Sequence, residues 1–235
     1  MSSRQEEKER RRRERQEREQ AEARATARRK RLQLVVGVVL GLAIIAGIAV
    51  AVVVGTGGGG NGKPKQASDA TAKVKLPTQQ VSDIKQAAKA AGCTLANPAF
   101  EGADHEQKKF KPSDYKTNPP TSGNHFPQWY DDGVYNPGDV PKLGMLVHTL
   151  EHGRIDVQYK PGTPDTTVKG LEALLAEQDD GYHMLLFQNT TGMKYAVAAT
   201  AWGQLLGCPA MNDKVYDALR TFRERYIDKG PETVN

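Results

Sequence analysis

The amino-acid sequence predicts an α+β fold: one N-terminal transmembrane helix, then a small, mainly antiparallel sheet with helices packed on one face. Three observations lead to this prediction. A charge-free apolar run, Leu34–Val54, follows a highly charged N-terminal arm. In the second half of the chain, short apolar strand-like segments are mixed with amphipathic segments, as in α+β domains. A segment rich in proline and glycine lies between these regions and predicts a long irregular loop.

The transmembrane helix is predicted from Leu34–Val54, which has 21 residues and no charged side chain. At about 1.5 Å per residue, this helix is roughly 31 Å long, which matches the hydrocarbon core of a bilayer. A cleaved signal peptide is the alternative, because Ala49-Val50-Ala51 resembles a cleavage site. The apolar run and the arm before it are both longer than in most signal peptides, which favours an uncleaved anchor.

The span also separates two regions of different charge. Residues 1–31 carry 13 Lys+Arg and 7 Asp+Glu, a net charge of +6. The remaining chain carries 20 basic and 21 acidic residues (33 less 13, and 28 less 7), a net charge of −1. The positive-inside rule therefore places the N-terminus in the cytoplasm and the C-terminal domain outside. Membrane lipid is the expected partner of the span, and the arm has the charge to contact anionic lipid headgroups. The alternative for the arm, which its composition favours, is a solvated topology signal without a specific partner. The outer domain lacks the positive charge needed to bind nucleic acid.

The predicted protein is a single-pass protein of the cell membrane. Gly37 and Gly41 form a G-x-x-x-G pattern in the span, which predicts a weak homodimer; the alternative is ordinary small-residue content. The chain is expected to divide into a basic cytoplasmic arm, 1–33, a transmembrane helix, 34–54, a flexible linker, 55–76, and an extracytoplasmic α+β domain, 77–235.

The elements of the outer domain follow from its apolar periodicity. Residues 78–91 predict a helix, which Thr78 can cap and Gly92 can end. Residues 93–143 contain the long loop, a type of segment that often carries functional side chains. The later elements are a strand at 155–159, a helix at 166–178, a hairpin of strands 183–188 and 195–202 joined by residues 189–192, and a helix from Asn212 or Asp213 to about Tyr226.

The chain contains two cysteines, Cys93 and Cys208. Because the domain is placed in an oxidising compartment, one disulfide between them is expected. Two free, buried thiols are the alternative.

The candidate metal ligands centre on the string His148-Thr149-Leu150-Glu151-His152-Gly153. In a helix, His148 and His152 share a face and can bind one metal ion. In a strand they would lie about 13 Å apart, so the hypothesis requires a helix. His125 is the expected third ligand, and three histidines with an open position suit zinc or copper.

Other residues could support such a site. His105, Met145 and the pair His183-Met184 are weaker accessory ligands, and a methionine near imidazoles would favour copper. The alternative is that the histidines only hydrogen-bond to the loop backbone and pack against aromatic side chains, Trp129 and Tyr130.

Glu151 is the candidate catalytic residue, if the protein is an enzyme. H-x-x-E-H matches a zinc-protease string in which this glutamate acts as the general base. That motif requires a long helix, whereas Gly153 is expected to end this one immediately. Asn189-Thr190-Thr191 is also a glycosylation sequon.

Four strings together resemble the domain of unknown function 3105 family of bacterial, mostly actinobacterial, proteins, many with one N-terminal span. They are Pro119-Pro120-Thr121-Ser122-Gly123-x-His125, Leu146-Val147-His148-Thr149-Leu150-Glu151-His152-Gly153, Ala199-Thr200-Ala201-Trp202-Gly203 and Gly230-Pro231-Glu232. The resemblance covers about residues 92–232. It implies a common site containing His125, His148, Glu151 and His152, and it implies no particular activity or substrate.

Three functional hypotheses follow for the outer domain. It is a membrane-anchored metal-binding module, a structural or interaction domain of the cell envelope without metal, or a zinc-dependent hydrolase that uses Glu151. The conformation of residues 146–152 separates the two metal hypotheses from the structural one.

Overall fold

The computed structural model describes residues 64–65, 74–177 and 179–232 of the chain. All of these belong to one compact unit, Gly59–Asn235. The predicted arm, the predicted span Leu34–Val54 with Gly37 and Gly41, and most of the predicted linker lie outside the described residues. Within the described ranges, no helix has the length and apolar character that a bilayer crossing requires.

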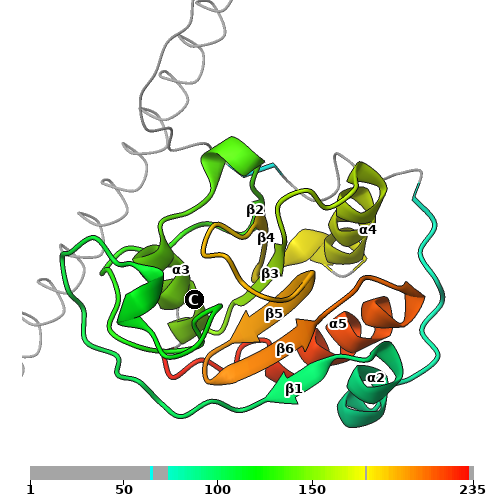
Figure 1. The fold of residues 1–235 in the computed structure, drawn as a ribbon, viewed down its shortest axis with the longest axis horizontal. Helices are drawn as coiled ribbons and strands as arrows, with labels where there is room; N and C mark the ends of the chain where they lie inside the picture. The colour runs from blue at the N-terminus through cyan, green and yellow to red at the C-terminus, as the bar shows by residue number, and fades with distance from the viewer. Residues whose placement is uncertain (1–63, 66–73, 178, 233–235) are drawn as a thin grey trace, which may run out of the picture. The chain divides into compact units, whose positions relative to one another are not determined.

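In the described part of the chain, six strands form one mixed sheet in the order β1-β6-β5-β3-β4-β2 (Figure 1). β1, β6, β5 and β3 are joined by antiparallel pairing, whereas β3, β4 and β2 pair in parallel. The α+β class is therefore confirmed, but the parallel half of the sheet was not expected. The strands are β1 (Thr94–Ala96), β2 (Gly133–Val134), β3 (Ile155–Tyr159), β4 (Met184–Gln188), β5 (Val197–Ala201) and β6 (Gln204–Cys208).

The predicted hairpin of residues 183–188 and 195–202 is wrong. Both segments contain strands, but β3 lies between them and pairs in parallel with β4 and antiparallel with β5. The hairpin is instead β5–β6, which turns at Trp202 and Gly203, and β6 was not predicted. Apolar alternation identifies a strand without identifying its neighbour, because many pairings bury the same face.

Among the described residues, four α-helices accompany the sheet, and they cover both of its faces (Figure 1). α2, α4 and α5 pack against the face formed by Val157, Leu186 and Leu206, where the main core lies. On the other face, Leu146 of α3 packs against Leu185 and Phe187. The prediction that the helices pack on one face of the sheet was therefore wrong. The helices are α2 (Ile84–Ala91), α3 (Leu143–Glu151), α4 (Asp165–Ala176) and α5 (Asp213–Tyr226).

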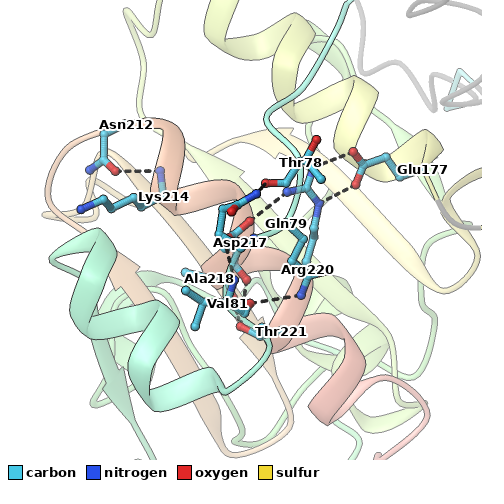
Figure 2. Close-up of polar contacts among 11 residues, drawn as sticks. Thr78, Gln79, Val81, Glu177, Asn212, Lys214, Asp217, Ala218, Arg220 and Thr221 are labelled. Atoms are coloured by element: carbon cyan, nitrogen blue, oxygen red, sulfur yellow. Dashed lines mark hydrogen bonds and ion pairs between the residues drawn. The ribbon is translucent and has the colours of Figure 1, made fainter.

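α2 is shorter than predicted because a different residue caps it. Asp83 accepts a hydrogen bond from the Gln86 N–H at 2.9 Å, so the helix begins at Ile84 and Thr78 is not its cap. The helix ends at Gly92, as expected. The Asn212 cap of α5 is likewise confirmed, since its side chain accepts from the Lys214 N–H (Figure 2).

A partly buried network of ion pairs and hydrogen bonds holds the start of the domain against α5. The Asp217 carboxylate accepts hydrogen bonds from the N–H groups of Gln80 and Val81, at 2.9 and 3.1 Å. Figure 2 shows Arg220 between this carboxylate and Glu177. Its guanidinium donates two hydrogen bonds to Glu177 at 2.6 and 2.7 Å, so α5 is also tied to the end of α4.

The long loop between β1 and α3 is confirmed as irregular. It contains the short 3-10 turns η2 (Pro112–Asp114) and η3 (Pro137–Asp139) and the two-residue strand β2; a third such turn, η4 (Asp179–Gly181), follows α4. Beneath α3, the Thr149 hydroxyl donates to Asp156 of β3 at 3.1 Å. Burial raises the pKa of Asp156 well above its usual range. α3 is thus fixed to the sheet through its own buried polar side chain.

Cys93 and Cys208 form the expected disulfide. Cys93 follows the end of α2, and Cys208 ends β6 in the main core. The bond therefore ties α2 to the edge of the sheet at which β1 pairs with β6.

Replacing both cysteines by alanine is expected to lower the free energy of unfolding by about 4–5 kcal/mol, the loop-entropy value for so long a closed loop. Denaturant unfolding of the oxidised protein and of the double variant measures this difference. Reduced wild-type protein is the matched control, because it keeps both sulfur atoms in the core. If the free energy of unfolding of the double variant and that of the reduced wild type each lay within about 1 kcal/mol of the oxidised wild type, this role of the bond would be contradicted.

Candidate metal centre

The decisive segment, residues 146–152, is helical up to Glu151. α3 spans Leu143–Glu151, and His152 is its C-terminal cap. His148 and His152 consequently lie one turn apart, with their Nε2 atoms 2.7 Å from each other. The helix on which the metal hypotheses depend is therefore present.

Backbone pairing in the long loop brings two further histidines to this helix. The N–H of Gly123 donates to Gly102, that of His125 donates to Asp104, and that of Glu106 donates to His125. These bonds form a short parallel bridge between His105 and His125. The two imidazoles therefore lie together, with ring centroids 4.8 Å apart.

Three of these histidines and Glu151 form a group with converging ligand atoms. One nitrogen each of His105, His125 and His148 and one Glu151 carboxylate oxygen all lie within 4.8 Å of one another. The carboxylate is 3.0 Å from His125 Nε2 and 3.4 Å from His105 Nε2. Ligand atoms at about 2.1 Å from a tetrahedral ion are about 3.4 Å apart, so these separations are close to a ligating arrangement.

The backbone fixes which nitrogen faces the centre of the group. His125 Nδ1 donates to the carbonyl of Gly123 at 2.8 Å, and His148 Nδ1 donates to that of Phe126 at 2.7 Å. In the neutral rings each Nε2 then carries the lone pair; that of His125 faces Glu151 at 3.0 Å, and that of His148 faces His152 Nε2 at 2.7 Å. Metal-binding histidines are commonly held in this way, with the second ring nitrogen bonded to a carbonyl or carboxylate.

A second, smaller group adjoins the first through His148. It consists of His148, His152 and Glu232, and Glu232 Oε2 is 3.9 Å from His152 Nδ1. The 2.7 Å separation of the two histidines is shorter than the spacing of ligands around one ion by about 0.7 Å. As they stand, these imidazoles are hydrogen-bonded to each other, and His152 would have to move outward to share an ion with His148.

The C-terminal segment reaches the site by crossing the end of α3. The Asp228 N–H donates to the carbonyl of Gly153, and the Glu232 N–H donates to that of Glu151. A Cβ at Gly230 would lie 2.1 Å from the carbonyl oxygen of Glu151 and would clash with it. Only glycine permits this close approach, and the approach places Glu232 beside His152.

Both tryptophans of the chain lie against the histidines. Trp202 meets the His125 ring edge-on at 5.9 Å, and the Gly203 N–H fixes the β5–β6 turn by donating to Thr121. The ring centroids of Trp129 and His152 are 4.7 Å apart, and Trp129 is 40% exposed. The His105 side chain is 41% exposed, whereas His125 is fully buried. The group is therefore enclosed by protein and reachable from solvent on the side of His105.

The structure brings together most of the predicted site residues, although metal binding itself stays a prediction. His125, His148 and Glu151 share one group, and His152 belongs to the adjoining one. His105, expected only as an accessory, is a full member of the first group. Its position could not be predicted, because no periodic pattern marks the loop bridge to His125. Glu232 was missed as a ligand, although its string was part of the family resemblance.

The remaining candidates lie elsewhere. His183 pairs with Asp228 at 2.6 Å, and Met184 is buried in the core on the opposite face of the sheet. Asn189 of the sequon is 1% exposed, and its amide donates to Gln158 at 2.7 Å. This asparagine is therefore inaccessible to a glycosylating enzyme in the folded domain.

A family model for proteins of unknown function, DUF3105, matches residues 105–235. The chain belongs to this family. The matched region covers more than half of the chain and contains every histidine and the Glu151 and Glu232 carboxylates. No curated protein and no solved structure matches the chain. The family description names no activity, and the histidine and glutamate groups of the DUF3105 domain could bind a metal.

Burial sets the protonation of the DUF3105 site. It lowers the pKa of His125 and His148, and together with the neighbouring His148 it lowers the pKa of His152 to about 4. Burial and the nearby Glu232 raise the pKa of Glu151. At neutral pH His125, His148 and His152 are therefore uncharged, which is the form of imidazole that binds metal.

The lowered pKa of His152 predicts a pH-dependent stability of the metal-free protein. As the pH falls from about 7 to about 4, this histidine is protonated in the unfolded chain but not in the folded one. The free energy of unfolding should fall across this window, by at most about 3 kcal/mol from this residue.

Raised acidic pKa values oppose this trend, so the test compares wild type with His152→Gln. Denaturant unfolding at several pH values in the presence of a chelator should give a shallower decline for the variant. Equal slopes for the two proteins would contradict the lowered pKa of His152.

Proposed function

We propose that the C-terminal domain binds one transition-metal ion through His105, His125, His148 and Glu151. The observation that carries this proposal is the convergence of their four ligand atoms within 4.8 Å, from three buried side chains and one exposed side chain, His105. Two backbone carbonyls hold the His125 and His148 rings in the tautomer that ligation needs. A purely structural role would not require three imidazoles to converge on one buried carboxylate.

The ligand types favour zinc, with copper(II) as its competitor. Imidazole nitrogen and carboxylate oxygen suit both ions. Both cysteines of the chain are in the disulfide, so no thiolate is available. Met184, which would have favoured a softer ion, is on the far face of the sheet. His152 lies beside His148 and could replace a ligand or hold an incoming ion.

A hydrolase with Glu151 as general base is less well supported. The Glu151 carboxylate lies 3.0 Å from His125 Nε2, which is a ligand position. α3 ends at this residue, so the long helix of the protease motif is absent from the described structure. Binding, storage or sensing of the ion agrees better with a carboxylate that ligates.

The protein is further proposed to hold this domain outside the cell membrane through Leu34–Val54, with its basic arm at the cytoplasmic lipid surface. The charge asymmetry across the apolar run supports this topology.

Elemental analysis of the purified full chain tests the metal proposal. About one zinc or copper ion per chain is expected, and His125→Ala or His148→Ala should lose it, because each removes a ligand. His183→Asn is the matched control, since His183 lies outside both groups and its backbone φ of 52° is one that asparagine tolerates. Metal at background in wild type, or metal retained in both alanine variants, would contradict the proposal.

The topology has its own test. In spheroplasts of cells that make the chain with a tag at each end, external protease should remove the C-terminal tag and spare the N-terminal one. A cleaved signal would instead yield a mature protein that lacks the arm. Protection of the C-terminal tag in sealed spheroplasts, with cleavage after lysis, would contradict an outside domain.

A further inference from the structure

A cavity of about 620 Å³ lies beside the candidate metal centre, between the loop around Phe110 and the start of α3. Its volume is within the range of about 300–1,000 Å³ typical of small-molecule sites. Phe126 belongs to both places, because it lines the cavity and its carbonyl accepts the hydrogen bond from His148. The cavity is a separate feature, since none of the proposed metal ligands lines it.

The wall of the cavity combines apolar side chains with charged side chains that are all positive. Phe110, Phe126 and Leu143 supply aromatic and aliphatic contacts. Three lysines, Lys108, Lys109 and Lys142, line it as well, and no acidic side chain is among its described lining residues. A neutral ligand would not require this excess, and a cation would be repelled by it.

Two of the lysines remain available for a ligand. Lys108 Nζ is already engaged, because it pairs with Glu106 at 2.9 Å and lies over the Phe110 ring at 4.9 Å from the centroid. Lys109 and Lys142 are exposed and make no side-chain ion pair or hydrogen bond within the described part of the chain. Their ammonium groups can therefore pair with an anion without losing an existing partner.

The aromatic wall is held in place by a close contact with the helix. A Cβ at Gly144 would lie 2.3 Å from the Phe110 ring, so the ring packs directly on the backbone at the start of α3. The same ring stacks with Tyr115 at 6.0 Å. This side of the cavity is consequently preformed, which reduces the entropy cost of binding a flat apolar group.

We propose that this cavity binds a small organic anion whose apolar or aromatic body packs on Phe110 and Phe126 while its charged group pairs with Lys109 and Lys142. A ligand of this class carries both an anionic group and an apolar body in the same molecule. Neither inorganic anions nor neutral aromatics meet both requirements. The site does not depend on metal binding by the histidines.

Isothermal titration of the full chain with sodium 2-naphthoate tests the proposal, with neutral 2-naphthamide as its isostere. Both titrations are run with a chelator present, so that the carboxylate cannot report on a metal ion. Saturable binding of naphthoate is expected, at least about tenfold tighter than that of naphthamide. 1-Naphthyl phosphate, run alongside, shows by its relative affinity whether the preferred anion is a carboxylate or a phosphate.

Variants then locate the binding. Lys109→Gln with Lys142→Gln should weaken naphthoate binding about tenfold and leave naphthamide unchanged, whereas Phe110→Ala should weaken both. Lys85→Gln with Lys89→Gln is the matched control, because it removes the same charge from exposed positions of α2. The proposal is overturned if naphthoate shows no saturable binding, if naphthamide binds equally well, or if the α2 variant loses as much affinity.

Discussion

The burial of the Glu151 carboxylate is the constraint on which the candidate site depends. Its side chain is 4% exposed, and its nearest polar neighbours, His125 and His105, are imidazoles. A buried carboxylate is costly unless a proton or a positive charge compensates it. The lowered pKa of His125 prevents that imidazole from supplying the charge at neutral pH, and the raised pKa of Glu151 reflects the same deficit. A bound divalent cation would supply the missing positive charge, and the imidazole lone pairs would coordinate the same ion.

The fold meets this constraint by attaching three distant chain segments to one short helix. α3 rests on the sheet through Leu146 and through the hydrogen bond from Thr149 to Asp156. The long loop joins it by the bond from His148 to the Phe126 carbonyl, and the C-terminal segment joins it by the bond from the Glu232 N–H to Glu151. The regular half of the domain thus serves as a support, whereas the irregular half supplies the groups that could bind a ligand.

Sequence patterns predicted the local features and failed where the outcome depends on long-range pairing. The i, i+4 spacing of His148 and His152 predicted their shared helix face, and cysteine count with topology predicted the disulfide. The neighbours of β3 could not be predicted, because alternation is the same for parallel and antiparallel partners. His105 reaches the site through a single backbone bridge to His125, which leaves no periodic trace in the sequence. The lysine-lined cavity likewise exists only after the loop has folded against α3.

Coordination of one ion by His105, His125, His148 and Glu151 would compensate this buried carboxylate. X-ray absorption spectroscopy of the zinc-loaded full chain measures that coordination directly. We expect a shell of nitrogen and oxygen atoms at about 2.0–2.2 Å with the outer-shell scattering of about three imidazoles. A spectrum of water-like oxygen ligands without imidazole scattering would contradict it, since it would place the ion away from His105, His125 and His148.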